Sequence, residues 1–358
     1  MNRILLGTQK GLVIFARGEK EWYCERSLFV GLPVTMVYPD PRNGHWWVGI
    51  AHRHWGQKLH RSTDQGQNWE EIKVPRYPKG AEIRPGKAAS LRQIWVMQHG
   101  GLDRPNRLYM GTEPGGLFVS ENNGDDWQLV QSLWDHPSRP EHWFGTGTDY
   151  PEIHSIVLDP RDSDHMYVAV SCAGVFESKD GGQSWHPRNK GLIAAYLPNP
   201  NVEVGHDPHR LLLCPSHPEV MWQQNHCGVF RSVDAGQNWQ LISEEGGLVD
   251  YGFALAVDPN DPERAWVIPA QSDAMRVAPD LGLYVATTED GGQNWRALRG
   301  GLPQQHAFDL VFRHALDLRA GTMAFGTTNG NVYLSETFGE SWQSLSHTLA
   351  RVNCLSFA

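Results

Sequence analysis

The sequence predicts an all-β protein, a seven-bladed β-propeller that forms a single domain over residues 1–358. An eight-residue pattern, Ser-x-Asp-x-Gly-x-x-Trp, recurs along the chain. Segments with strand character surround each copy, and the two ends of the chain each supply part of an incomplete unit. A repeat that runs from end to end favours one closed array, although the length alone would allow two domains.

The repeated pattern is clearest at residues 178–185 (SKDGGQSW). Four further close copies begin at Ser62, Ser120, Ser232 and Thr288, and a looser copy begins at Ser335. The starts lie 58, 58, 54, 56 and 47 residues apart. A period of this size is typical of an array of similar supersecondary units.

Each copy is predicted to be a turn between two strands. The aspartate can accept hydrogen bonds from the following backbone amides, the glycine adopts a positive φ without steric cost, and the tryptophan opens the next strand. Asn122 can replace the aspartate in the third copy, whereas Thr337 can do so only in part in the last copy. We therefore assign a structural role, and no catalytic one, to Asp64, Asp180, Asp234 and Asp290.

This turn resembles the Asp-box, or BNR repeat, of sialidases and related β-propellers. The whole chain is similar to bacterial single-domain WD40/YVTN/BNR-like propellers that are labelled sialidase-like or glycosyl hydrolase-like. The resemblance implies the fold but little about function, because the motif also occurs in two-domain xyloglucanases, sorting receptors and a photosystem assembly factor. The early Arg-Ile-Pro motif of sialidases is missing, the nearest string being Ile83-Arg84-Pro85, so true sialidase activity is not expected.

The strand pattern gives four strands per unit, here lettered A to D from the channel outward. In the fourth unit, residues 153–158, 165–170 and 174–178 are predicted to be strands A, B and C, and Trp185 opens strand D. The first unit has B, C and D but no A, and residues 351–357 have the A pattern. The C-terminal strand is therefore expected to complete the N-terminal blade and leave no open sheet edge. This makes seven blades, with six as the alternative.

Composition limits the partners and the compartment. The net charge of −9 disfavours nucleic acid and anionic membranes as partners, and no apolar run is long enough to span a membrane. The five cysteines include no CxxC pair, which disfavours a disulfide framework or a thiolate zinc site. The first residues show no hydrophobic segment of signal length, so a cytoplasmic location is expected.

The blade topology places the D-to-A and B-to-C loops on one face, and the repeated turns on the other. Long insertions occur in the first group, at residues 74–90, 131–152, 189–208 and 271–281. The sequence therefore predicts a one-sided, polar pocket at the mouth of the central channel, on the face opposite the repeated turns.

The start of each A strand and the end of each B strand are rich in polar side chains that converge on this mouth. The candidate ligand-binding residues are Arg92, His154, His209, Arg210, Gln224, His226, Arg276, His306, His52 and Lys58. The candidate catalytic carboxylates are Glu113, Glu152, Asp207, Asp250 and Asp309. His306 and Asp309 are expected in or just before the A strand of the last blade.

Three chemistries can be built from these residues. The favoured one is binding of a small polar or carbohydrate-like ligand, with catalysis left undecided. A carboxyl pair could cleave a glycoside, and a divalent metal held in the channel by His154, His209 and His226 could serve a lyase or hydrolase. The remaining alternative is a scaffold that binds or assembles another protein.

Overall fold

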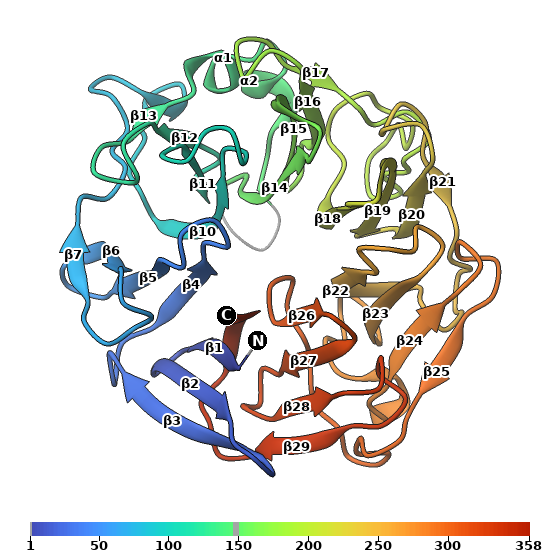
Figure 1. Cartoon of the computed structure of the whole chain (residues 1–358). Helices are drawn as coiled ribbons and strands as arrows, with labels where there is room; N and C mark the ends of the chain where they lie inside the picture. Colours follow the sequence, from blue (N-terminus) through green and yellow to red (C-terminus); the bar gives the residue numbers. More distant parts are fainter. Residues whose placement is uncertain (1, 146–149) are drawn as a thin grey trace.

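A computed structural model describes residues 2–145 and 150–358 of the chain. Over these residues the chain forms seven four-stranded antiparallel sheets, which stand around a central channel like blades (Figure 1). This confirms the predicted seven-bladed β-propeller and rules out the six-bladed alternative. Within the same residues no helix is long and apolar enough to cross a membrane.

In each blade the four strands are ordered from the channel outward, and their bounds are given below in that order. The first three blades are β30 (Val352–Phe357), β1 (Arg3–Thr8), β2 (Gly11–Arg17) and β3 (Trp22–Leu28); β4 (Val34–Pro39), β5 (Trp46–His52), β6 (Gly56–Ser62) and β7 (Glu70–Ile72); and β10 (Gln93–His99), β11 (Leu108–Glu113), β12 (Leu117–Ser120) and β13 (Gln128–Leu129). The fourth and fifth are β14 (Ile153–Asp159), β15 (Asp162–Val170), β16 (Gly174–Ser178) and β17 (His186–Pro187); and β18 (Pro208–Cys214), β19 (His217–Asn225), β20 (Gly228–Ser232) and β21 (Gln240–Leu241). The last two are β22 (Tyr251–Val257), β23 (Ala265–Ala270), β24 (Val285–Thr288) and β25 (Arg296–Leu298); and β26 (Leu316–Arg319), β27 (Thr322–Gly326), β28 (Val332–Ser335) and β29 (Gln343–Ser346).

Short elements decorate the connections between blades. A two-stranded hairpin, β8 (Glu82–Arg84) and β9 (Lys87–Ala88), lies in the loop before the third blade. The helices α1 (Gln131–Trp134) and α2 (Arg139–His142) lie in the insertion before the fourth blade. The 3-10 turn η1 (Pro279–Leu281) lies in the insertion between β23 and β24 of the sixth blade. Residues 146–149 of the predicted insertion 131–152 are outside the described residues.

The ring is closed by strands from both ends of the chain. Strand β30 pairs antiparallel with β1, with Phe357 opposite Ile4 and Leu355 opposite Leu6. The two termini therefore lie close together in the first blade (Figure 1). The expected completion of the N-terminal blade by the C-terminal strand is confirmed.

The repeated turns have the hydrogen bonds that their residues predict. The Asp180 carboxylate accepts bonds from the backbone amides of Gln183 and Ser184, both at 2.9 Å. Gly182 has a φ of +89° and donates its amide to the Ser178 hydroxyl at 2.8 Å. The Thr337 hydroxyl of the last copy accepts one amide bond, from Ser341 at 3.1 Å. These contacts fix the link between the two outer strands of each blade.

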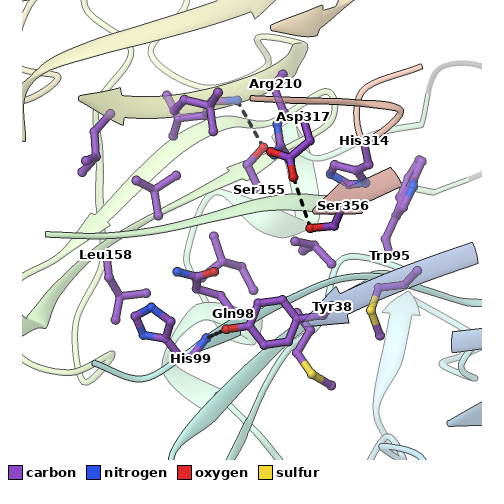
Figure 2. A pocket seen from close by; sticks show the side chains of 18 of the residues that line it. Tyr38, Trp95, Gln98, His99, Ser155, Leu158, Arg210, His314, Asp317 and Ser356 are labelled. Carbon is purple, nitrogen blue, oxygen red and sulfur yellow. Dashed lines mark hydrogen bonds between the residues drawn. The ribbon is translucent and has the colours of Figure 1, made fainter. Parts of the chain in front are cut away.

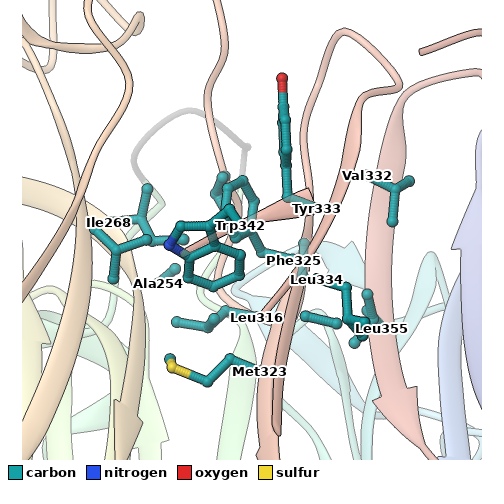
Figure 3. Close-up of a cluster of buried hydrophobic side chains, with 14 of the residues drawn as sticks. Ala254, Ile268, Leu316, Met323, Phe325, Val332, Tyr333, Leu334, Trp342 and Leu355 are labelled. Atoms are coloured by element: carbon teal, nitrogen blue, oxygen red, sulfur yellow. The ribbon is translucent and has the colours of Figure 1, made fainter. Parts of the chain in front are cut away.

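The hydrophobic core lies between neighbouring blades. Figure 3 shows the largest cluster, in which Phe325 and Trp342 of the seventh blade face Ala254 and Ile268 of the sixth, and Leu355 packs beside them. The rings of Phe325 and Trp342 meet edge to face with centroids 4.8 Å apart. The tryptophan that ends a repeated turn also joins one blade to the next: Trp295 of the sixth blade meets Trp222 of the fifth edge to face, with ring centroids 6.4 Å apart, which explains the recurrence of this residue.

The seventh blade differs from the prediction. Its A strand, β26, begins at Leu316, so His306 and Asp309 lie in the preceding loop well before the strand. Residues 307–312 (AFDLVF) are apolar apart from Asp309, and Ala307 and Val311 enter the core as part of a loop. The expectation that His306 and Asp309 adjoin the A strand is therefore wrong, because apolar residues buried in a loop resemble those of a buried strand in sequence.

Candidate functional site

The central channel holds two cavities that meet at Trp95 and His314. The loop-side cavity, of 580 Å³, opens on the face of the D-to-A and B-to-C loops, as predicted. Its described lining residues are Gln9, Pro33, Thr35, Ala51, His52, Arg53, Gly56, Gln57, Gln93, Trp95, Phe312, Arg313, His314, Arg351 and Asn353. They come from the first, second, third and seventh blades.

The loop-side cavity is polar and positively charged. Four amide side chains, those of Gln9, Gln57, Gln93 and Asn353, surround it, and Trp95 gives it an aromatic wall. Arg53, Arg313 and Arg351 add three guanidinium groups, and no described lining residue is an aspartate or glutamate. In a chain with a net charge of −9 this is a local concentration of positive charge.

Aromatic rings hold two of these arginines in place. The Arg313 guanidinium carbon lies 5.3 Å from the Trp95 ring centroid and 5.2 Å from that of Phe253. The Arg351 guanidinium carbon lies 4.6 Å from the Phe312 ring centroid. Burial lowers the pKa of the Arg351 guanidinium below its ordinary value, which means that the surroundings disfavour its charge. A bound anion would offset that cost.

The turn-side cavity, of 480 Å³, is lined by residues of the A-to-B turns such as Pro160 and Pro215. It therefore lies at the opposite face, and the predicted one-sidedness of the channel is wrong. The A-to-B turns are too short to cover this end. Figure 2 shows Arg210 and Asp317 side by side at the wall, where Ser356 donates its hydroxyl to Asp317 at 3.3 Å. Burial raises the pKa of Asp317 from its ordinary value of 3.8. Aliphatic residues such as Leu158 make much of the remaining wall.

A third feature is a cluster of ionisable side chains beside the channel, formed by Asp207, His209 and His226. One nitrogen or oxygen atom from each lies within 4.8 Å of the other two. The Asp207 carboxylate lies 3.5 Å from His209 Nε2 and 3.6 Å from His226 Nδ1. Asp207 and His209 are buried, and the His226 side chain is 23% exposed.

The predicted histidines are thus distributed over several places. His52 lines the loop-side cavity, and His209 and His226 join Asp207. His154 is fully buried on β14, where its Nδ1 lies 3.1 Å from the Ser155 hydroxyl and its ring meets Trp95 edge to face. Among the described residues, His154 is not part of the group formed by Asp207, His209 and His226.

The remaining predicted ligand-binding residues have other neighbours. Arg210 lines the turn-side cavity, because it follows His209 on β18 and points the opposite way. Gln224 is buried and donates to the carbonyls of Asn225 and Gly228. Two residues form ion pairs, Lys58 with Glu71 at 2.5 Å and Arg276 with Asp273. Arg92 lies over the Tyr150 ring. His306 is exposed in its loop with a φ of +55°.

The five predicted carboxylates do not come together in the loop-side cavity. Asp309 accepts a bond from Asn331 at 2.8 Å, and Asp250 accepts one from the Gly246 amide at 2.9 Å. Glu113 ends β11, and Glu152 is buried directly before β14. Asp207 lies beside two of the predicted ligand-binding residues, His209 and His226. The described lining therefore contains no carboxyl pair that could act on a glycoside there.

Sequence reasoning missed three residues that matter to the channel, namely Trp95, Arg313 and His314. Trp95 lies inside an apolar strand pattern and was not separated from core residues. Arg313 and His314 lie in the loop before β26, and the sequence alone does not show that this loop passes the channel. An Arg-His pair directly after the apolar run of residues 310–312 was the available signal.

No protein-family model matches the chain. It is similar to xyloglucanase Xgh74A of Acetivibrio thermocellus, with 26% identity over 291 residues that cover 72% of this chain and 31% of the xyloglucanase. The chain thus spans less than a third of the length of the curated relatives it matches.

Two solved structures are similar in fold. One is an ancestral GH74 enzyme, with a TM-score of 0.58 and 17% identity over 95% of this chain and 40% of that one. The other is YCF48 bound to D1 peptide, with a TM-score of 0.54 and 14% identity over 93% of this chain and 89% of that one. At such identities the structural similarity shows the propeller fold alone.

Proposed function

We propose that the protein binds a small, polar, carbohydrate-like ligand that carries a negative charge, and that it does so in the loop-side cavity. The observation that carries the proposal is the lining of that cavity. It combines three arginines, four amide side chains and one indole, and its described part contains no carboxylate.

Each part of this lining suits a part of such a ligand. Amide side chains both donate and accept, as sugar hydroxyls do, and an indole offers a flat apolar surface for a sugar ring. A guanidinium presents a planar pair of donors that matches a carboxylate or phosphate. The similarity to a xyloglucanase supports a carbohydrate-like ligand, and the arginines add the requirement for negative charge.

A matched pair of sugars tests the proposal. Glucuronate and glucose differ in a carboxylate, so calorimetric titration should give at least tenfold tighter binding of glucuronate. Arg313→Gln should remove most of this preference, since a tenfold change corresponds to about 1.4 kcal/mol. Arg76→Gln is the control, because Arg76 is exposed and is not among the lining residues. Equal affinity for the two sugars would contradict the assignment of charge.

A second candidate is a binding site for a protein on the same face. Trp55, Met275 and Phe308 lie in its loops and are 75%, 57% and 55% exposed. Exposed apolar side chains on one face are typical of an interaction surface. Trp55→Ala combined with Phe308→Ala should weaken cross-linking to a partner in cell extract and leave sugar affinity unchanged if this candidate is correct.

A further inference from the structure

The cluster of Asp207, His209 and His226 has a hydrogen-bonding pattern that suits a positive charge between its members. His209 Nδ1 lies 2.6 Å from the carbonyl oxygen of Gly252. A carbonyl only accepts, so Nδ1 carries the proton, and in the neutral ring Nε2 is left with a lone pair. That lone pair faces the Asp207 carboxylate at 3.5 Å. Two acceptors that face each other repel unless a positive ion or proton lies between them.

The surroundings of His209 hold its ring in one place. The side chain is buried, and its ring stacks on that of Phe253 with centroids 4.5 Å apart. A neutral imidazole whose Nδ1 donates to a backbone carbonyl is the usual state of a metal-binding histidine, because that bond fixes the ring and the tautomer.

Strand pairing explains why the three side chains meet. Asp207 and His209 are two residues apart at the start of β18, so they can lie on one face. Pro208 pairs with Asn225 of β19, and His226 follows directly in the turn to β20. The His226 amide then donates to the Asp207 carbonyl at 2.9 Å, which brings the two side chains together.

We propose that Asp207, His209 and His226 form a binding site for one divalent transition-metal ion of the zinc class. Two histidines and one carboxylate are a common ligand set for Zn²⁺ sites that keep a further position for water or substrate. This site is separate from the proposed sugar site, and neither requires the other.

The distances agree with such an ion. Tetrahedral Zn²⁺ with bonds of about 2.0–2.1 Å places neighbouring ligand atoms about 3.4 Å apart. The two distances from Asp207, 3.5 and 3.6 Å, are close to that value. The positive charge of Arg313 would compete with the ion for the Asp207 carboxylate. Asp273 adds negative charge near His226 and is itself paired with Arg276. The exposure of His226 gives the ion access from solvent.

Metal titration of the untagged protein tests this proposal. After dialysis against chelator and then against metal-free buffer, calorimetry with Zn²⁺ should show one site per chain. Co²⁺ in its place should give the visible absorption of a tetrahedral ion. A hundredfold excess of Zn²⁺ over Kd should raise the Tm by roughly 4 °C.

Variants locate the ion. His226→Gln is the main test, because this side chain is partly exposed and its loss should leave the fold intact, as circular dichroism would check. It should weaken Zn²⁺ at least tenfold, and Asp207→Asn should do the same. His186→Gln is the control, because His186 is exposed on the outer strand β17. The proposal is overturned if the wild-type protein shows no Zn²⁺ site or if His226→Gln keeps it. Repeating the glucuronate titration on metal-free protein separates this result from that of the sugar site.

Discussion

Glu177 in the fourth blade offers a sharp test of how this structure is stabilised. Its carboxylate is 2% exposed and accepts bonds from His165 at 2.8 Å, Tyr167 at 2.9 Å and Arg188 at 2.6 Å. Burial alone would raise the pKa of Glu177. The bonds from His165 and Tyr167 and the charge of Arg188 outweigh that effect and lower it from 4.5 to about 2.

Glu177→Gln keeps the shape and removes the charge. The difference between 4.5 and about 2 corresponds to about 3 kcal/mol in the free energy of unfolding. The variant should therefore lose about 2–3 kcal/mol at pH 7, measured by urea unfolding with tryptophan fluorescence. Glu121→Gln is the matched control, because Glu121 pairs with Arg107 but its side chain is 60% exposed, and it should cost less than about 1 kcal/mol.

The pH dependence of the stability difference between wild type and Glu177→Gln can refute this reasoning. The folded pKa lies below the unfolded one, so the stabilisation by Glu177 is complete above pH 4.5 and is lost as the pH falls toward about 2. The gap between wild type and Glu177→Gln should fall to under half of its pH 7 value at pH 3. An equal gap at pH 7 and pH 3, or a gap below about 0.5 kcal/mol at pH 7, would refute the reasoning.

Two further changes probe the ring and the turns. Gly326→Ala would place a Cβ 2.5 Å from Val352 of β30, so thermal unfolding should show a loss of about 1–3 kcal/mol in the free energy of unfolding. Gly115→Ala, whose new Cβ would have its nearest neighbouring atom at 3.5 Å, should cost clearly less. Asp180→Ala should cost about 1 kcal/mol, because it removes two backbone amide partners of the kind that helix caps satisfy. Thr337→Ala removes one such bond and should cost less in the same urea experiment, and an equal loss would count against this account of the turns.

The fold could be predicted from the sequence because it repeats. Each turn carries its own hydrogen-bonding residues, and the missing A strand of the first unit matched the unpaired segment at the other end. The seventh blade was the exception. There the apolar residues Ala307 and Val311 fill a space between blades without forming a strand, and a short apolar run does not show whether it is a strand or a buried loop.

The candidate site was only partly predictable. The loop-side mouth was expected from topology, and His52 was placed there correctly. The approach of His226 to Asp207 depends on the register of β18 and β19, in which a bulge between Pro208 and Arg210 shifts the pairing. His154 and His209 occupy similar positions in neighbouring blades, yet only His209 faces a carboxylate. The spacing of the sequence repeats gives no information about such side-chain directions.

The closure of the first blade by β30 has a consequence for the order of folding. Six blades can be completed from contiguous sequence as the chain is made, but β1 keeps an exposed edge until Val352–Phe357 have been synthesised. The last step of folding is thus a long-range docking, which topology makes slow. Because the two termini lie together, the chain could be joined there and reopened in a loop between blades, and such a circular permutant would build every blade from contiguous residues.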